Sequence, residues 1–266
     1  MTAIRASQLG LKTAVIERES LGGICLNWGC IPTKALLKSA NVFDYIKNAE
    51  DYGIKVAPPE ADFSGMVARS RGIADGMSKG VTFLLKKNKV DVIMGTGKVL
   101  AGKRIEVTTN EGGTQVLETS NIIIATGARS RQLPNLPQDG NKIIGYREAL
   151  TLKTKPKKMV VVGSGAIGVE FAYFYNSIGT DVTIVEYMDG IVPLEDKEIG
   201  KQLEKSLKKQ GITIKTSAEV TSVDTSGSGC KVSVKTKKGE ETIECDIVLS
   251  AVGVIANIEN IGLEDV

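Results

Sequence analysis

Residues 159–170 read MVVVGSGAIGVE, and this stretch decides the fold. It opens with four apolar, largely strand-forming residues, and the glycines that follow have the spacing G-x-G-x-x-G. Glycine permits a tight turn and a close approach of the backbone to a phosphate, and a helix that starts there directs its N-terminal amides at the ligand. The stretch therefore predicts a buried strand, a phosphate-binding turn and a helix that runs to Gly179.

The next segment completes the pattern of a dinucleotide site. Residues 181–186 read DVTIVE, a second strand that ends in an acid about 20 residues after the first glycine. An acid in this place accepts a hydrogen bond from the ribose 2′-OH of NAD, and the following residues YMD offer no cation to a 2′-phosphate. We predict a Rossmann-type site for NAD, formed by Gly163, Gly165, Ala166, Ile167, Gly168 and Glu186.

The N-terminal residues have the pattern of the second half of another such unit. Residues 1–9 are helical in pattern, Gly10 ends the helix, and residues 12–17 read as a buried strand that ends in Glu17. The strand and glycine loop that would open this unit are not in the sequence. We therefore expect an incomplete nucleotide-binding unit ahead of the complete one.

Residues 22–34 read GGICLNWGCIPTK and bring two cysteines five positions apart. On a regular helix such residues lie about 140° apart, which does not allow the Cα separation of a disulfide. Residues 26–29 are therefore expected to be irregular, with Pro32 opening the helix that follows. A redox disulfide, a structural disulfide, part of a metal site and chance all fit this spacing, although the chain has no histidine for a zinc site.

The two cysteines are expected to differ in chemistry. Cys30 would lie at a helix N-terminus, where the helix dipole favours a thiolate, and Lys34 adds positive charge one turn on. Cys25 has neither aid. This asymmetry suits a disulfide in which one sulfur meets a substrate and the other meets an electron donor or acceptor.

The remaining pattern is a series of short elements. We expect helices over residues 35–52, 62–87 and 196–210, strands over 90–94, 121–128, 212–215 and 246–253, a hairpin of 104–109 with 114–119, and an antiparallel meander over 219–244. Gly95-Thr96-Gly97 reads either as a plain turn or as backbone that lies close to a ligand.

Composition excludes several classes of protein. The net charge is +3 with no block of like charges, so nothing favours nucleic acid. No apolar run has the length of a membrane span, and no secretory leader is evident. Four cysteines are too few for a secreted disulfide framework, so we expect a cytoplasmic protein in which a disulfide is catalytic.

Residues 22–37 read GGICLNWGCIPTKALL. This stretch resembles the active-site motif of the flavin-dependent pyridine nucleotide-disulfide oxidoreductases, and most closely that of the dihydrolipoamide dehydrogenases. The resemblance covers the whole chain and implies an α/β fold of two Rossmann-like nucleotide-binding domains, each with a small antiparallel β-meander. Residues 1–150 would be the FAD-binding domain, incomplete at its N-terminus, and residues 151–266 the NAD-binding domain. We expect the latter to contain every strand of its own sheet.

The resemblance also implies roles for individual residues. Cys25 would exchange with the substrate, Cys30 would face the flavin, and Lys34 and Glu170 would form a charge pair beside the flavin ring. Glu17 would bind the adenosine ribose of FAD. The backbone assigned to the cofactors comprises Gly22, Gly23, Gly97, Ala125, Thr126, Gly127 and Gly253. For Lys34 and Glu17 the alternative is an ordinary surface charge.

The implied function is oxidation of dihydrolipoamide through the disulfide and FAD, with reduction of NAD⁺. The expected partners are a lipoyl carrier protein of the 2-oxoacid dehydrogenase or glycine cleavage complexes and, in full-length relatives, a second copy of the chain. No metal, nucleic acid or membrane is expected. The alternatives are another disulfide reductase of this family, using NADPH, and a nucleotide-binding fragment without catalysis.

Overall fold

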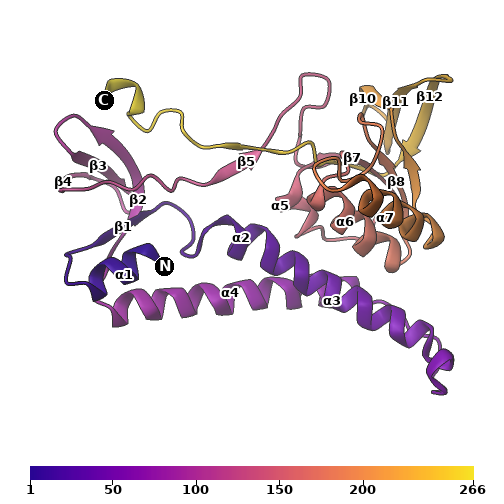
Figure 1. The fold of residues 1–266 in the computed structure, drawn as a ribbon, viewed down its shortest axis with the longest axis horizontal. Coiled ribbons are helices and arrows are strands. Elements are labelled where there is room, and N and C mark those ends of the chain that lie inside the picture. The colour runs from indigo at the N-terminus through magenta and orange to yellow at the C-terminus, as the bar shows by residue number, and fades with distance from the viewer. The chain divides into compact units, whose positions relative to one another are not determined.

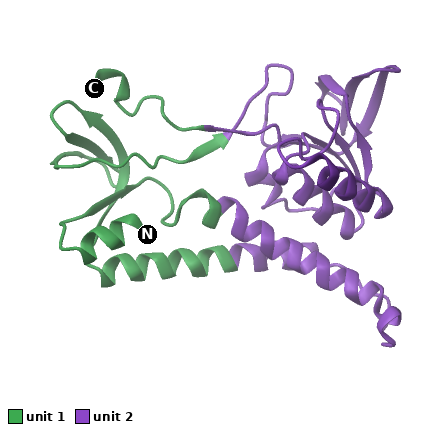
Figure 2. Ribbon diagram, viewed as in Figure 1, with its two compact units in different colours: residues 1–27, 73–129, 256–266 green, residues 28–72, 130–255 purple.

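The computed structural model describes residues 1–266, and its helices and strands are labelled in Figure 1. Two compact units interleave along the chain and are coloured in Figure 2. Unit 1 comprises residues 1–27, 73–129 and 256–266, and unit 2 comprises residues 28–72 and 130–255. The predicted domains 1–150 and 151–266 are drawn from the two nucleotide-binding patterns in the sequence, whereas the two units are defined by contacts within the structure. The predicted domain boundaries therefore stay a prediction.

Unit 2 is built on a five-stranded parallel sheet in the order β6-β13-β7-β8-β9. Its strands are β6 (Ile143–Ile144), β7 (Lys158–Val162), β8 (Asp181–Val185), β9 (Thr213–Lys215) and β13 (Ile247–Ser250). Helices α6 (Ala166–Ser177) and α7 (Lys197–Lys209) connect parallel neighbours. Most residues of β7, β8 and β13 are buried, as in a sheet covered on both faces. This confirms the predicted Rossmann-like unit.

An antiparallel meander of β10 (Glu219–Asp224), β11 (Cys230–Thr236) and β12 (Gly239–Cys245) joins this sheet to a common core. Val232 and Val234 on its inner face are fully buried with Val160 and Val248 of the parallel sheet. The predicted meander is therefore confirmed, and alternation along β11 explains why only one of its faces is apolar.

The NAD-type domain does not contain its whole sheet, so that prediction is wrong. The short strand β6 precedes residue 151, and its Ile143 and Ile144 pair with Val248 and Leu249 of β13. Helix α5 (Tyr146–Ala149) follows β6, and the buried hydroxyl of Tyr175 donates a hydrogen bond to the carbonyl of Ala149 at 2.6 Å. A two-residue strand carries no periodic pattern, which is why the sequence does not reveal it.

The cysteine helix also belongs to unit 2. Helix α3 (Cys30–Lys47) packs against α6, and the single turn η1 (Ala49–Tyr52) follows it before Gly53, whose φ of +72° ends the helical path. Helix α4 (Phe63–Lys87) begins in unit 2, where Phe63 contacts Phe174 and Tyr175 of α6. The Asp62 carboxylate accepts a hydrogen bond from the Gly65 amide at 2.9 Å and so caps the start of the predicted helix.

Unit 1 holds a four-stranded sheet in the order β1-β2-β3-β4. Strand β1 (Ala14–Glu17) is parallel to β2 (Asp91–Leu100), and β3 (Arg104–Thr109) and β4 (Thr114–Glu118) continue it as antiparallel strands. Helix α1 (Thr2–Gln8) precedes β1, and Gly10 follows it with a φ of +86°. The predicted helix, glycine and hairpin are confirmed. The predicted strand is present but begins at Ala14, and none of its residues is buried, so the prediction of a buried strand is wrong. No helix of the chain has both the length and the apolar character needed to cross a membrane.

The glycines of β2 are not a turn, so the predicted strand end at residue 94 is wrong. Gly95 and Gly97 lie inside the strand, opposite Thr109 and Val107 of β3. A Cβ atom on Gly95 would lie 2.4 Å from the carbonyl oxygen of Thr108. The partner strand therefore approaches too closely for any side chain at that position.

Residues 121–127 form no strand, although their pattern predicts one. The side chain of Ile123 is 71% exposed, and the only strand here is β5 (Ala128–Ser130), which pairs with β14 (Val254–Ala256). An apolar, β-branched run becomes a strand only beside a hydrogen-bonding neighbour. Strand β1 pairs with β2 alone, and no strand forms a hydrogen-bonded ladder with residues 121–127.

Candidate functional site

The two cysteines lie on either side of a break between two helices. Helix α2 (Gly23–Trp28) ends at Trp28, Gly29 has φ −139° and ψ −116°, and α3 begins at Cys30. Cys25 and Cys30 are disulfide-bonded to each other. The predicted irregular stretch 26–29 is therefore reduced to Gly29, because residues 26–28 are helical. The break at this one glycine is what lets residues five apart in sequence form the bond.

Asn27 holds this break in place, and the sequence did not point to it. Its side chain is 4% exposed, and its amide donates hydrogen bonds to the carbonyls of Leu21 and Gly23, each at 3.0 Å. A buried amide that bonds to preceding carbonyls fixes the backbone ahead of the disulfide. The only available signal was the residue type, since asparagine commonly closes local turns through its side chain.

Cys30 is the first residue of α3, as predicted. The amide and hydroxyl of Thr33 both donate to the carbonyl of Gly29, at 3.1 and 2.7 Å. Pro32 is the third residue of the helix instead of its first, where its missing N–H still costs nothing. The dipole of this helix favours negative charge at its N-terminus, where Cys30 lies.

The structure brings Lys34 and Glu170 together. The ammonium of Lys34, on α3, forms an ion pair and hydrogen bond with the carboxylate of Glu170, on α6. Their side chains are 59% and 28% exposed, so the pair adds only about 0–1 kcal/mol to stability. What the pair does is fix a positive charge one turn after Cys30; its role beside a flavin stays a prediction.

The glycine loop has the three properties that a dinucleotide needs. Gly163 has a φ of +95°, and a Cβ on Gly168 would lie 2.1 Å from the carbonyl oxygen of Gly163, so one glycine makes the turn and the other allows close packing. A Cβ on Gly165 would meet nothing within 4 Å. Gly165 caps α6, whose first residues are Ala166 and Ile167. Open space at a helix N-terminus fits a pyrophosphate.

Glu186 follows β8 but does not present a free carboxylate. The residue is 6% exposed. Its Oε1 accepts a hydrogen bond from the amide of Met188 at 2.8 Å, and its Oε2 accepts bonds from the amide and hydroxyl of Ser164 at 2.7 and 2.6 Å. Sequence reasoning placed Glu186 at the ribose and missed Ser164, because the variable position of G-x-G carries no signal of its own.

The residues assigned to FAD in unit 1 lie at the end of β1, at the start of α2 and within β2. Glu17 ends β1, and its Oε1 accepts a hydrogen bond from the amide of Glu19 at 2.8 Å. Gly22 and Gly23 have φ of +110° and +78° at the start of α2. Gly97 lies within β2, where a Cβ would contact Ile105 and Ile16 at 3.4 and 3.5 Å. The assignment of these residues to FAD stays a prediction.

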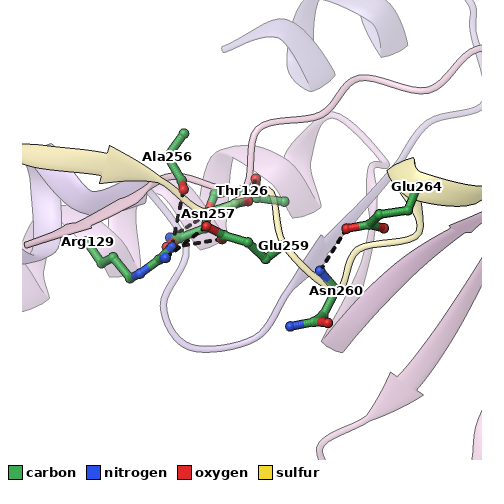
Figure 3. A network of polar contacts seen from close by, with 7 residues as sticks. All are labelled: Thr126, Arg129, Ala256, Asn257, Glu259, Asn260 and Glu264. Atoms are coloured by element: carbon green, nitrogen blue, oxygen red, sulfur yellow. Dashed lines mark hydrogen bonds and ion pairs between the residues drawn. The ribbon is translucent and has the colours of Figure 1, made fainter. Parts of the chain in front are cut away.

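The Ala125-Thr126-Gly127 segment is tied to the C-terminal residues of the chain (Figure 3). The Thr126 hydroxyl donates to the Asn257 carbonyl at 2.5 Å, and the Asn257 amide side chain donates back to the Thr126 carbonyl at 3.1 Å. The amide of Asn257 also donates to the carbonyl of Gly127, whose φ is +73°. This exchange holds the segment in a defined path without a sheet, and the sequence did not predict it.

A bidentate ion pair closes the same network. The two terminal guanidinium nitrogens of Arg129 each donate to a carboxylate oxygen of Glu259 at 3.0 Å. Figure 3 marks this ion pair with dashed lines. The hydrogen bond from Arg129 lowers the pKa of Glu259 to about 2. In unit 2, Gly253 has a φ of +107° and its carbonyl accepts a bond from the Arg131 amide at 3.0 Å, so it forms part of a turn after β13.

A disulfide at a helix N-terminus, together with a complete dinucleotide loop, defines an α/β nucleotide-binding protein with a thiol redox centre. Residues 1–265 match the family described as pyridine nucleotide-disulphide oxidoreductase, and the chain belongs to this family. The cofactors of the family are FAD and NAD. Among the residues present, the loop 163–168 has the open space and the helix N-terminus that fit a dinucleotide. The assignment of Glu17 and residues 125–127 to FAD stays a prediction.

Two curated relatives of this family are similar to almost the whole chain. A dihydrolipoyl dehydrogenase of Zymomonas mobilis is 47% identical over 265 residues, which cover 99% of this chain and 57% of the relative. One of Bacillus subtilis is 40% identical over 275 residues, covering 100% of this chain and 58% of the relative. The chain thus spans little more than half the length of these relatives.

Solved structures agree on the fold. The crystal structure of LpdA from Mycobacterium tuberculosis superposes with a TM-score of 0.89 at 29% identity, over 98% of this chain and 57% of that one. The HOCl-induced flavoprotein disulfide reductase RclA from Escherichia coli, in its Cu(II) complex, gives 0.81 at 25% identity, over 98% and 55%. The predicted fold class is confirmed.

Proposed function

We propose that the chain carries the redox disulfide and the nucleotide sites of a dihydrolipoamide dehydrogenase. In this role it oxidises dihydrolipoamide to lipoamide and, with FAD, reduces NAD⁺. The observation that carries the proposal is the Cys25–Cys30 disulfide at the start of α3, in a chain that also holds a complete dinucleotide loop. The names of its curated relatives support the choice of substrate.

The first step is thiol–disulfide exchange. A substrate thiolate attacks the sulfur of Cys25, so a mixed disulfide forms there and Cys30 leaves as a thiolate. The second substrate thiolate then attacks the substrate sulfur of the mixed disulfide, which closes the lipoamide ring and releases Cys25. Two electrons pass to the cysteine pair and two protons leave the substrate. Cys30 is the better leaving group because the N-terminus of α3 stabilises its negative charge.

FAD, when bound, supplies a two-electron carrier between the cysteine pair and NAD⁺. The residues of this chain position the reactants around it. Lys34, held by Glu170, keeps a positive charge on the helix that begins with Cys30. The amides at the start of α6 hold the pyrophosphate of NAD, and Gly165 leaves the space for it.

The finer assignments belong to the same proposal. The substrate is dihydrolipoamide on a lipoyl carrier protein of a 2-oxoacid dehydrogenase or glycine cleavage complex, and the complete enzyme is a cytoplasmic homodimer. The likeness to RclA favours a disulfide reductase as the second candidate. Glu186 favours the dihydrolipoamide dehydrogenase over a disulfide reductase that uses NADPH, because its carboxylate would repel the 2′-phosphate of NADPH.

The exchange step is tested by counting thiols. Dihydrolipoamide is added to the oxidised chain and the accessible thiols are titrated after its removal; we expect two more per chain than before. Cys230 and Cys245 are buried and do not contribute. Cys30→Ser, which cannot form the disulfide, is the control and should show no gain. An unchanged thiol count in the wild-type chain would contradict the proposal.

Steady turnover by this chain alone is expected to be slow. No histidine is present to take the dithiol proton near neutral pH. Purified chain is measured for flavin absorbance and assayed with dihydrolipoamide and NAD⁺. Stoichiometric flavin with turnover near 10 s⁻¹, an ordinary enzyme rate, would show that the residues present suffice.

A further inference from the structure

Ser164 is fully buried, and every polar atom it has is used. It occupies the variable position of the loop Gly163-Ser164-Gly165. Its amide and hydroxyl both donate to Oε2 of Glu186, at 2.7 and 2.6 Å, and its carbonyl accepts a hydrogen bond from the amide of Val192 at 3.0 Å. One residue of the phosphate loop is thus joined to the strand-end acid and to the segment that follows it.

These bonds limit what Glu186 can accept from a ligand. An ionised carboxylate offers about four acceptor positions. Ser164 uses the two on Oε2, and the amide of Met188 uses one on Oε1. One position remains, on Oε1. A ribose that presents two hydroxyls can therefore donate only one of them to this carboxylate.

Val192 shows that the arrangement is held under constraint. Its φ is +43°, a region that β-branched residues rarely occupy. Such a conformation persists only where the surroundings impose it, and here the amide of Val192 bonds to Ser164 while its carbonyl accepts from the Glu195 amide at 2.9 Å. The segment after β8 is consequently fixed against the phosphate loop.

We propose that Ser164 is a positioning and specificity-determining residue for the dinucleotide: it fixes Glu186 so that a single acceptor oxygen faces one ribose hydroxyl. Ser164 does not touch the ligand in this role. It acts through Glu186, keeping the buried carboxylate where a 2′-hydroxyl finds an acceptor and a 2′-phosphate finds a like charge. The inference rests on the proposed function, since it takes NAD as the ligand of this loop.

The variant Ser164→Ala deletes the hydroxyl and leaves the backbone amide in place. A hydrogen bond to a charged group carries enough energy that we expect the Kd for NADH to rise about tenfold. The Kd for NADPH should change less than threefold, because the same carboxylate disfavours its phosphate. The ratio of the Kd for NADPH to the Kd for NADH should therefore fall several-fold. If the hydroxyl had only a structural role, its loss would weaken the binding of both nucleotides equally and leave this ratio unchanged.

A matched control and a second variant separate the explanations. Thr180→Val removes another buried hydroxyl of unit 2, which donates to the Pro156 carbonyl at 2.8 Å, and should leave the ratio unchanged. In a Glu186→Gln background, Ser164→Ala should change the Kd for NADH less than twofold, because the two residues act as one unit. Thermal melts confirm that each variant is folded.

The measurement is fluorescence titration of the 266-residue chain with NADH and with NADPH. Two results would overturn the inference and leave the proposed function standing, provided that the wild-type chain binds NADH. One is an unchanged NADPH-to-NADH ratio of Kd values in Ser164→Ala. The other is an effect of Ser164→Ala on the Kd for NADH that simply adds to that of Glu186→Gln. Wild-type chain that binds neither nucleotide overturns both.

Discussion

At the residue scale, we expect the long helix that begins at Cys30, together with the charge of Lys34, to make Cys30 the stronger acid of the two cysteines. Cys30 opens the 18-residue α3 and has Lys34 one turn on. Cys25 is the third residue of the six-residue α2, so it also lies in a first turn, but of a much shorter helix and with no cation one turn on. In Cys25→Ser the remaining thiol should therefore have a lower pKa than the thiol remaining in Cys30→Ser. The rate of alkylation, measured against pH for both variants, gives the two values. If Cys25 is the more acidic thiol, the assignment of leaving group is reversed.

Also at this scale, the preference for NAD should depend on the charge at position 186. Glu186→Arg is expected to shift the ratio of NADH to NADPH affinities by about 100-fold, since a favourable hydrogen bond is lost for one ligand and a phosphate contact is gained for the other. Most of the shift should come from weaker NADH binding, because the two donors of Ser164 lose their acceptor. Tyr187→Arg, at a residue 72% exposed, adds the same charge nearby and should shift the ratio far less.

At the scale of elements, Trp28 joins three helices beside the disulfide. The guanidinium of Arg71 on α4 lies 4.2 Å from the centre of its ring, and that of Arg147 on α5 lies 4.8 Å from it. Each such contact contributes about 0.5–2 kcal/mol. Trp28→Ala should lower the free energy of unfolding by about 3–5 kcal/mol, and Trp28→Phe by clearly less, because a ring remains between the two cations.

Urea denaturation, followed by circular dichroism because Trp28 is the single tryptophan, measures this difference. Phe43→Ala is a suitable comparison: its ring has one lysine contact at 5.5 Å, and it lies on the same helix as Cys30. Equal losses in Trp28→Ala and Trp28→Phe would show that the aromatic ring is not what joins the helices.

The elements that sequence reasoning located are those whose signal is local. The glycine loop, the break before Cys30 and the cap at Asp62 each follow from neighbouring residues, and the structure shows all three. The misplaced elements depend on partners far away in sequence. A glycine is required at position 95 because β3 approaches closely there, and Thr126 and Gly127 bond to Asn257 instead of to a neighbouring strand.

The same distinction holds within the candidate site. Lys34 and Glu170 were paired through the resemblance to a family, and the structure shows the contact. Ser164 and Asn27 were missed because their importance lies in what their polar atoms reach once the chain has folded. No spacing rule in the sequence encodes those distances.

At the scale of the whole molecule, the boundary of the NAD-type domain is decided by β6. Four side chains of residues 143–150 are at most 4% exposed: Ile143 and Ile144 of β6, Ala149 of α5, and Leu150, which follows α5. Burying a large aliphatic side chain contributes about 1.5–3 kcal/mol, so the three largest carry several kcal/mol, against a typical domain stability of about 5–15 kcal/mol.

A chain of residues 130–266 should therefore unfold cooperatively and bind NADH, whereas a chain of residues 151–266 should be largely unfolded. Both lack α3 and α4, so the comparison isolates β6 and α5, which cover Val248 and Leu249 at the edge of the sheet. Without β6 these buried residues would also present an unpaired strand edge, a site for aggregation. Chemical denaturation and NADH titration of both chains measure the difference. Equal unfolding midpoints would mean that the parallel sheet is stable from β13 to β9 alone, and that the domain begins where the sequence pattern first placed it.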